Sequence, residues 1–360
     1  MSRFKNLSSP VKCLIFFLIL GILFTTGEFS IRIYARSHWK RAIRIGDLCR
    51  LDDSLGYRLK ENYDGGSFKI NSKGIVGPEY TIDKKTSYRI IVLGDSCSFT
   101  PQPDSWPFEL EKSLNEAGED KTLKSKVWSF EVINGSVSGY TSLQCAEWYT
   151  TELSDYQHEA TLIMLGWNDM WSYNPFTPRY TEFKQNRKYK QRFTDKISSL
   201  YTVRAIISVL RMYASKGKSY DRELTPDQVS RFKDFSPSYY EESLREIIKK
   251  ARESGSQPFL VERPAILNDH MTSDEINRCH FPFKVPHNVE ILKKLDLIYN
   301  NAMEKVAQEE KVEILRTRQL FTTDAERKHF NDTCHFDSDA SSRIGKEVAD
   351  ELIQKMGWNK

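Results

Sequence analysis

The sequence predicts a doubly wound α/β/α sandwich built on a mainly parallel five-stranded sheet, and two observations carry this prediction. Five short apolar, β-branched runs follow one another after residue 86, and helical patterns separate them. Strands that are apolar on both faces and alternate with helices are typical of a parallel sheet that is covered on both sides. The expected strands are Arg89–Leu93, Phe130–Asn134, Ala160–Leu165, Pro258–Glu262 and Lys311–Arg316.

Helices are expected between these strands and after the last of them. Their patterns cover Trp106–Ala117, Ser142–Leu153, Pro237–Glu253, Val289–Glu310 and Ser341–Met356. The segment 172–234 is too long for an ordinary connection between a strand and a helix. Since it is rich in aromatic and basic residues, we interpret it as a cap-like insertion over a pocket. The alternative is an amphipathic cover helix with a solvated loop.

Residues 1–30 are expected to form an N-terminal membrane anchor. Lys12 is the one charged residue between Val11 and Gly27, and a spanning helix needs about 17 to 25 apolar residues. A cleaved signal peptide is the alternative, but no Ala-x-Ala-like cleavage site follows Phe24. A buried core helix is disfavoured because the run has no amphipathic pattern.

Residues 31–85 are interpreted as a juxtamembrane helix and a lead-in segment. Four basic residues recur at helical spacing, so one face of this helix either lies on anionic headgroups or is solvated: Arg32, Arg36, Lys40 and Arg44. Three basic residues precede the apolar run and five follow it, a count that by itself would keep the C-terminal side in the cytoplasm. Long downstream domains translocate largely regardless of such charges. We therefore expect a single-pass membrane protein with an extracytoplasmic domain at residues 86–360.

The formal charge of +4 on this 360-residue chain is unevenly distributed. Residues 1–44 carry eight basic residues and one acidic residue, whereas the other 316 carry 45 basic and 48 acidic residues. A nucleic-acid-binding domain needs a basic patch on the folded domain itself, so no nucleic-acid partner is expected. The six cysteines show no C-x-x-C pair and no zinc-site spacing, so no metal or organic cofactor is implied. One or two disulfides, and any oligomeric state, remain open.

Polar residues gather where the predicted strands end. Gly94-Asp95-Ser96 follows the first strand, the loop 134–140 follows the second, and Asn168 follows the third. The segment 332–335, with Asp332 and His335, lies between the last strand and the last helix. In an open α/β sheet, chemistry takes place at the carboxyl ends of the strands.

These residue types predict nucleophilic catalysis. A serine hydroxyl is a weak nucleophile until a base takes its proton, and Ser96 and His335 supply these two groups. Asp332, three residues before His335, can hold the ring tautomer that leaves Nε2 facing Ser96. The backbone N–H groups of Ser96 and of the loop after Asn134, with the Asn168 amide, are expected to stabilise an oxyanion.

The chain resembles the SGNH (GDSL-type) esterases and acylhydrolases. The resemblance rests on Gly94-Asp95-Ser96, the loop after Asn134, Gly166-x-Asn168-Asp169 and Asp332-x-x-His335, and covers about residues 86 to 356. It implies a flavodoxin-like sandwich and hydrolysis or transfer of O-acyl groups. It also implies Ser96 as nucleophile, Asn168 as amide donor, and Asp332 and His335 as the other triad members. Asn71-Ser72-Lys73-Gly74 is similar to a short element of membrane-anchored members.

The second block departs from the usual family pattern. The alignment places Ser136 where the family has its oxyanion glycine, and a serine still has a backbone N–H. Gly135 is the alternative donor. Cys97, directly after the nucleophile, is expected to be a small buried residue.

The function expected from the sequence is therefore a membrane-anchored serine esterase or acyltransferase. Its expected substrate is an O-acyl group of a cell-envelope glycan or a lipid. A catalytically silent glycan-binding or scaffold protein with the same fold is the alternative from another class. The presence of all four catalytic side chains disfavours that alternative.

Overall fold

The computed structural model describes residues 9–38, 48–65, 68–84, 86–99, 105–119, 129–176, 223–281 and 285–358. The chain divides into two compact units. One comprises Met1–Asp47 with Tyr189–Ser219, and the other comprises Leu48–Lys188 with Tyr220–Lys360.

The described part of the first unit is one long helix, α2 (Ser9–His38). It holds a 22-residue apolar stretch, Pro10–Ile31, that is long enough to cross a membrane and has almost no burial within the protein. The same helix continues through the first part of the expected juxtamembrane segment. Lys40 and Arg44, and the side chains of Arg32 and Arg36, lie outside the described residues.

A five-stranded parallel sheet forms the centre of the second unit, as the sequence predicted. Its strands are β5 (Tyr88–Gly94), β6 (Phe130–Asn134), β7 (Ala160–Met164), β8 (Gln257–Val261) and β9 (Glu313–Leu315). Their order is β6-β5-β7-β8-β9, with every neighbouring pair parallel. In chain order this is 2-1-3-4-5, the flavodoxin-like arrangement. The order reverses beside β5, the strand that leads to Ser96.

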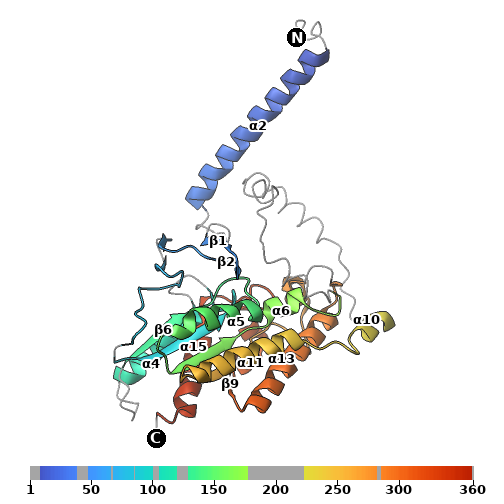
Figure 1. Cartoon of the computed structure of the whole chain (residues 1–360). Helices are drawn as coiled ribbons and strands as arrows, with labels where there is room; N and C mark the ends of the chain where they lie inside the picture. The colour runs from blue at the N-terminus through green and yellow to red at the C-terminus, as the bar shows by residue number, and fades with distance from the viewer. Residues whose placement is uncertain are drawn as a thin grey trace. The chain divides into compact units, whose positions relative to one another are not determined.

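Helices cover both faces of this sheet (Figure 1). One layer consists of α4 (Trp106–Glu119) and α15 (Ser338–Lys355), which pack against each other. The other consists of α5 (Ser142–Thr151), α11 (Ser238–Glu253) and α13 (Val289–Glu310). Helices α4 and α15 approach closely at Gly345, where a Cβ atom would lie 2.6 Å from the Trp106 carbonyl oxygen. The three layers confirm the predicted fold class.

Two small hairpins precede the sheet. Strands β1 (Cys49–Asp52) and β2 (Gly56–Leu59) form the first, and β3 (Tyr63–Asp64) and β4 (Lys69–Ile70) form the second. The Asn71–Gly74 element forms a tight turn after β4: the Asn71 side chain accepts the N–H groups of Lys73 and Ile75, and Gly74 has a φ of +76°. This turn leads to Val76, which pairs with Asn134 at the end of β6.

Short helical elements complete the described part of this unit: η1 (Leu153–Asp155), α6 (Trp167–Ser172), α10 (Pro226–Arg231), α12 (Ser273–Arg278), η2 (Arg318–Phe321) and α14 (Asp324–Arg327). Residues 177–222, most of the predicted cap, lie outside the described residues. Its aromatic and basic members there include Arg179, Tyr180, Phe183, Lys184, Arg187, Lys188, Tyr189, Lys190 and Arg192.

Candidate active site

The Ser96 side chain sits on a tight turn directly after β5. The buried Asp95 carboxylate accepts the N–H of Cys97 at 2.9 Å, and the Asp95 carbonyl accepts the N–H of Ser98 at 3.1 Å. A Cβ atom at Gly94 would lie 2.4 Å from Ser98 Oγ, so glycine is required where the strand meets the turn. These contacts hold Ser96 half-buried at the carboxyl edge of the sheet.

The side chains of Ser96, His335 and Asp332 form one continuous chain of hydrogen bonds. His335 Nε2 lies 2.7 Å from Ser96 Oγ, and His335 Nδ1 lies 2.8 Å from Asp332 Oδ2. The other carboxylate oxygen, Asp332 Oδ1, accepts the backbone N–H groups of Cys334 at 3.0 Å and His335 at 2.9 Å. Asp332 therefore fixes both the ring and the backbone on which the ring is carried.

The charges of this pair support each other. Burial opposes ionisation of Asp332, but the hydrogen bonds from the His335 ring and from two backbone N–H groups outweigh it and lower the pKa of Asp332 to about 2. The hydrogen bond to Asp332 and the contact with Cys334 raise the pKa of His335 above its ordinary value, against the effect of burial. The pair is thus suited to stabilise an imidazolium.

A second histidine–carboxylate pair lies close by in the sequence but is separate. His329 Nδ1 lies 2.8 Å from Asp337 Oδ2. Asp337 also accepts the N–H of Ala340 and caps the start of α15. Asp337 therefore orients His329, whereas the carboxylate that contacts His335 Nδ1 is Asp332.

Asn168 lies at the start of α6, directly after β7. One N–H of its side-chain amide donates to the Tyr140 carbonyl oxygen at 3.1 Å, which leaves the second amide N–H for another acceptor. Gly166, the N-cap of α6 two residues earlier, has a φ of +125°, and a Cβ atom there would approach the Arg263 and Tyr240 side chains at 3.2 Å. This close packing fixes the start of α6, and Asn168 there contacts the loop after β6 at Tyr140.

The structure does not support Ser136 as a donor to a substrate oxygen. Ser136 is fully buried, and its N–H donates to the Asn134 side-chain oxygen at 3.1 Å. The alternative, Gly135, donates its N–H to the Val92 carbonyl at 2.9 Å. Both N–H groups are occupied by hydrogen bonds within the protein, because the chain still runs beside β5 just after the end of β6.

Gly139, three residues further on, was missed by the sequence reasoning. It is exposed, has a φ of +86°, and among the described residues its N–H has no hydrogen-bond partner. Its neighbour Tyr140 supplies the carbonyl that accepts the Asn168 amide. The signal in the sequence was the second glycine of this loop, the position at which the chain turns.

An aromatic pair lies beside the loop that carries Asp332. The Trp171 and His280 rings are stacked, with centroids 6.0 Å apart and planes within 11°. Trp171 is on α6, one turn after Asn168, while the N–H of His280 donates to Thr333 Oγ at 2.7 Å. The pair connects α6 to the loop of Asp332 and His335.

The fold and the site together define a flavodoxin-like α/β/α domain with a Ser-His-Asp arrangement at the carboxyl edge of its sheet. No family model matches the chain, and no curated protein matches its sequence. Solved structures similar to this chain include a GDSL-like lipase from Bacteroides thetaiotaomicron (10% identity, 74% of this chain and 88% of that chain, TM-score 0.40). An acetylxylan esterase from Geobacillus stearothermophilus is similar at 13% identity, over 76% of this chain and 97% of that chain, with a TM-score of 0.43. A carbohydrate acetylesterase from Sinorhizobium meliloti is similar at 13% identity, over 75% of this chain and 100% of that chain, with a TM-score of 0.42. The function is therefore inferred from the geometry of the site.

Proposed function

We propose that this protein is a membrane-anchored serine esterase or O-acyltransferase of the SGNH type. The observation that carries the proposal is the unbroken sequence of contacts from Asp332 through His335 to Ser96, with distances of 2.8 and 2.7 Å. A nucleophile, a base and a group that orients the base are the minimum set for acyl transfer through a serine.

In the proposed reaction, Ser96 Oγ attacks the carbonyl carbon of an ester while His335 Nε2 takes the hydroxyl proton. The resulting imidazolium is stabilised by Asp332 and gives its proton to the departing alcohol, which leaves an acyl group on Ser96. Water then attacks this acyl-serine to release a carboxylic acid. If a sugar hydroxyl attacks in place of water, the acyl group is transferred, and the same three residues serve both outcomes.

The negative charge on the carbonyl oxygen requires donors, and we propose three. They are the backbone N–H of Ser96, the backbone N–H of Gly139 and the second N–H of the Asn168 side chain. The backbone N–H groups of Ser96 and Gly139 have no hydrogen-bond partner among the described residues. Each such donor contributes roughly 3 to 4 kcal/mol to the lowering of the barrier.

Two features support an O-acyl group of a cell-envelope glycan or lipid as the substrate. The apolar stretch of α2 would keep the protein at a membrane. The stacked Trp171–His280 pair offers a flat ring face beside the catalytic loop, which suits a sugar ring. We further propose that the domain is extracytoplasmic; digestion by protease added to intact cells would support this, and full protection would contradict it.

The test of the enzymatic proposal is covalent labelling with a fluorophosphonate, which reacts with activated serines. We expect labelling of the wild-type protein and none of Ser96→Ala. Ser341→Ala is the matched control, because it removes a buried hydroxyl that has no hydrogen-bond partner among the described residues. An intact, folded wild-type protein that is not labelled would favour a silent glycan-binding protein instead.

Hydrolysis and transfer are distinguished in cells. Mass spectrometry of envelope glycans from cells with wild-type protein or Ser96→Ala measures the O-acyl content directly. Accumulation of O-acyl groups in the variant identifies a hydrolase, whereas their loss identifies a transferase.

A further inference from the structure

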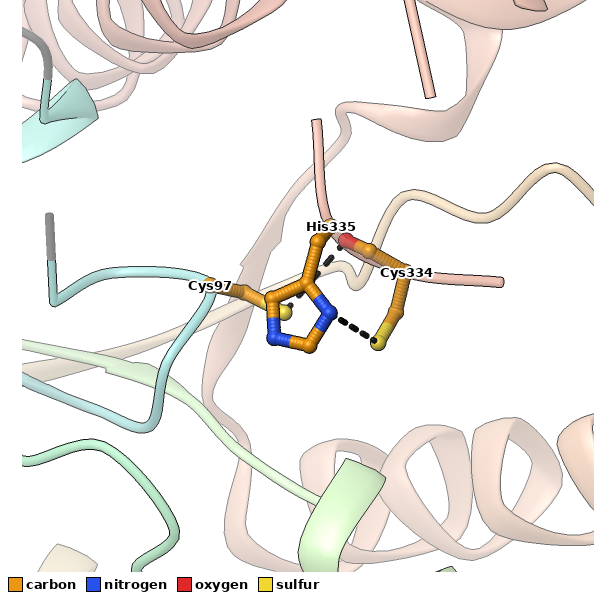
Figure 2. A group of neighbouring side chains, drawn as sticks. All are labelled: Cys97, Cys334 and His335. Atoms are coloured by element: carbon orange, nitrogen blue, oxygen red, sulfur yellow. Dashed lines mark hydrogen bonds between the residues drawn. The ribbon is translucent and has the colours of Figure 1, made fainter. Parts of the chain in front are cut away.

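Two thiols flank the proposed catalytic pair. Cys97 follows Ser96 and Cys334 precedes His335 in the sequence, and Figure 2 shows both beside the His335 ring. Cys97 Sγ–H donates to the Cys334 carbonyl at 3.4 Å, and Cys334 Sγ lies 3.8 Å from His335 Nδ1. Both cysteines are buried, and both are free thiols. The proposed mechanism uses neither of them.

The spacing of these three side chains is close to that of a metal site. One ligand atom from each of Cys97, Cys334 and His335 lies within 4.8 Å of the other two. A sulfur about 2.3 Å and a nitrogen about 2.0 Å from a tetrahedral ion are roughly 3.5 Å apart. The 3.8 Å between Cys334 Sγ and His335 Nδ1 is therefore nearly right, and the other ligand atoms need move by no more than about 1 Å.

The ligand types select the class of ion. Thiolate and imidazole are soft and borderline ligands that favour Zn²⁺ and its heavier analogue Cd²⁺ over Mg²⁺ or Ca²⁺. Three protein ligands leave a fourth position of the tetrahedron for an oxygen ligand. The sequence spacing could not show this cluster, because 237 residues separate the two cysteines.

We propose that Cys97, Cys334 and His335 Nδ1 form a binding site for a thiophilic divalent cation, and that the bound cation inactivates the Ser96–His335 pair. The binding itself does not depend on the proposed function, whereas the inactivation does. Binding would release one proton from each thiol to the solvent.

Inactivation follows from the tautomer of His335. A neutral imidazole carries one proton, and the contact with Asp332 places it on Nδ1, so that Nε2 can accept the proton of Ser96. A cation on Nδ1 would move that ring proton to Nε2 and take the place of the Asp332 hydrogen bond. Nε2 would then donate to Ser96 Oγ and could no longer act as the base.

The experiment is a titration of the reduced, full-length protein in detergent with Cd²⁺, followed by the ultraviolet cadmium–thiolate absorption. We expect one tightly bound Cd²⁺ in the wild type, and roughly 100-fold weaker binding in Cys97→Ser and in Cys334→Ser. Cys49→Ser is the matched control, because Cys49 lies on β1 and is more accessible than Cys97 or Cys334; this variant should bind Cd²⁺ as the wild type does. Equal binding by all four proteins would overturn the proposal.

A measurement on the wild type alone covers the case in which the cysteine variants fail to fold. X-ray absorption of the Zn²⁺-loaded protein should give a first shell of two sulfurs and one nitrogen, with oxygen from water. A shell of nitrogen and oxygen only would overturn the site.

The inactivation has its own readout. Fluorophosphonate labelling of Ser96 should slow at least about tenfold with one equivalent of Cd²⁺ and recover after addition of EDTA. Labelling that continues unchanged with Cd²⁺ bound would overturn the inactivation. Failure of the metal-free protein to label, with Cd²⁺ binding intact, would contradict the proposed function and leave the metal site standing.

Discussion

Asp332 contacts His335 twice, through Oδ2 to the ring Nδ1 at 2.8 Å and through Oδ1 to the backbone N–H at 2.9 Å. The second contact is local, because Asp332 precedes His335 by only three residues. The Asp-x-x-His spacing thus allows one carboxylate to hold both the ring and the backbone N–H of the histidine.

Asp332→Asn should lower kcat by about 10³ to 10⁴-fold with little change in the fold, because an amide can present its N–H to Nδ1 and favour the wrong ring tautomer. Asp337→Asn is the matched control. Asparagine also caps helices well, and Asp337 contacts His329 instead of His335, so kcat should change only a few-fold. Comparable losses in the two variants, measured by ester hydrolysis, would show that Asp332 has no special role.

The pH dependence of kcat/KM should report the raised pKa of His335. Only the unprotonated ring can accept the Ser96 proton, so activity is lost as the pH falls through this pKa. Since Asp332 stabilises the protonated ring, the acid limb should have its midpoint above about 6.5, the ordinary value for histidine. A midpoint at or below that value in a pH–rate profile would contradict the stabilisation of the protonated ring by Asp332.

Gly139→Ala should impair both stability and catalysis. Its positive φ costs an alanine about 1 to 2 kcal/mol, and the new Cβ would lie 2.5 Å from the Tyr57 hydroxyl oxygen, so the loop or the Tyr57 side chain must shift. We expect kcat/KM to fall roughly 10² to 10³-fold, as for the loss of one oxyanion donor.

Gly255→Ala provides the control for backbone strain. Gly255 has a similar φ of +77°, and a Cβ atom there meets no atom within 4 Å. Its variant should lose similar stability in thermal unfolding but keep full activity. If the Gly139 variant also stays fully active, Gly139 is not a donor.

Asp169 should make the protein less stable as the pH rises. This carboxyl is fully buried, and burial raises its pKa to about 6 although Ser142 donates to it through N–H and hydroxyl groups. The folded state therefore binds the proton more tightly than the unfolded state, whose pKa is about 3.9. The contribution of Asp169 to the free energy of unfolding is therefore at its maximum below about pH 4. This contribution declines by up to about 3 kcal/mol as the pH rises through 6.

Denaturant unfolding of wild type and Asp169→Asn between pH 4 and 8 measures this difference. The free energy of unfolding should fall with pH less steeply in the variant. Asp227→Asn, a change at an exposed carboxylate, controls for the loss of one acidic group. Parallel curves for wild type and Asp169→Asn would disprove the expected linkage.

Trp171→Ala should separate substrate binding from chemistry. The ring stacks on His280 and lies one turn from Asn168, so its loss should raise KM for an acylated oligosaccharide about tenfold or more. Hydrolysis of a small aryl acetate, which lacks a sugar ring, should change little. Trp171→Phe keeps a stacking face and should behave closer to the wild type; equal effects on both substrates would exclude a sugar-binding role.

The sheet could be predicted because its strands are buried on both faces. Strand β6 begins and ends at the residues expected from its apolar run, Phe130 and Asn134. Strand β9 is shorter than the expected Lys311–Arg316, because Lys311 still belongs to the left-handed end of α13, with a φ of +52°. The hairpins before the sheet had no such signal, since their strands are two to four residues long and partly exposed.

The convergence of Ser96, Asp332 and His335 followed from their chemistry and their positions after strands. The proposed oxyanion donor Gly139 did not follow from the sequence, because the direction of a backbone N–H depends on the path of the loop. At Ser136 the N–H still points into the protein, toward Asn134, and the chain turns outward only near Gly139. Similarly, the predicted small buried residue at Cys97 gave no hint that Cys334 lies against it.

Ser96 and His335 are 239 positions apart in the sequence, and four strands of the sheet, β6 to β9, lie between them. His335 lies after β9 and directly before α15, the helix that packs against α4. A ribosome-bound or truncated chain that ends before residue 335 carries the nucleophile without its base. The proposed acyl chemistry would therefore be absent from any such fragment.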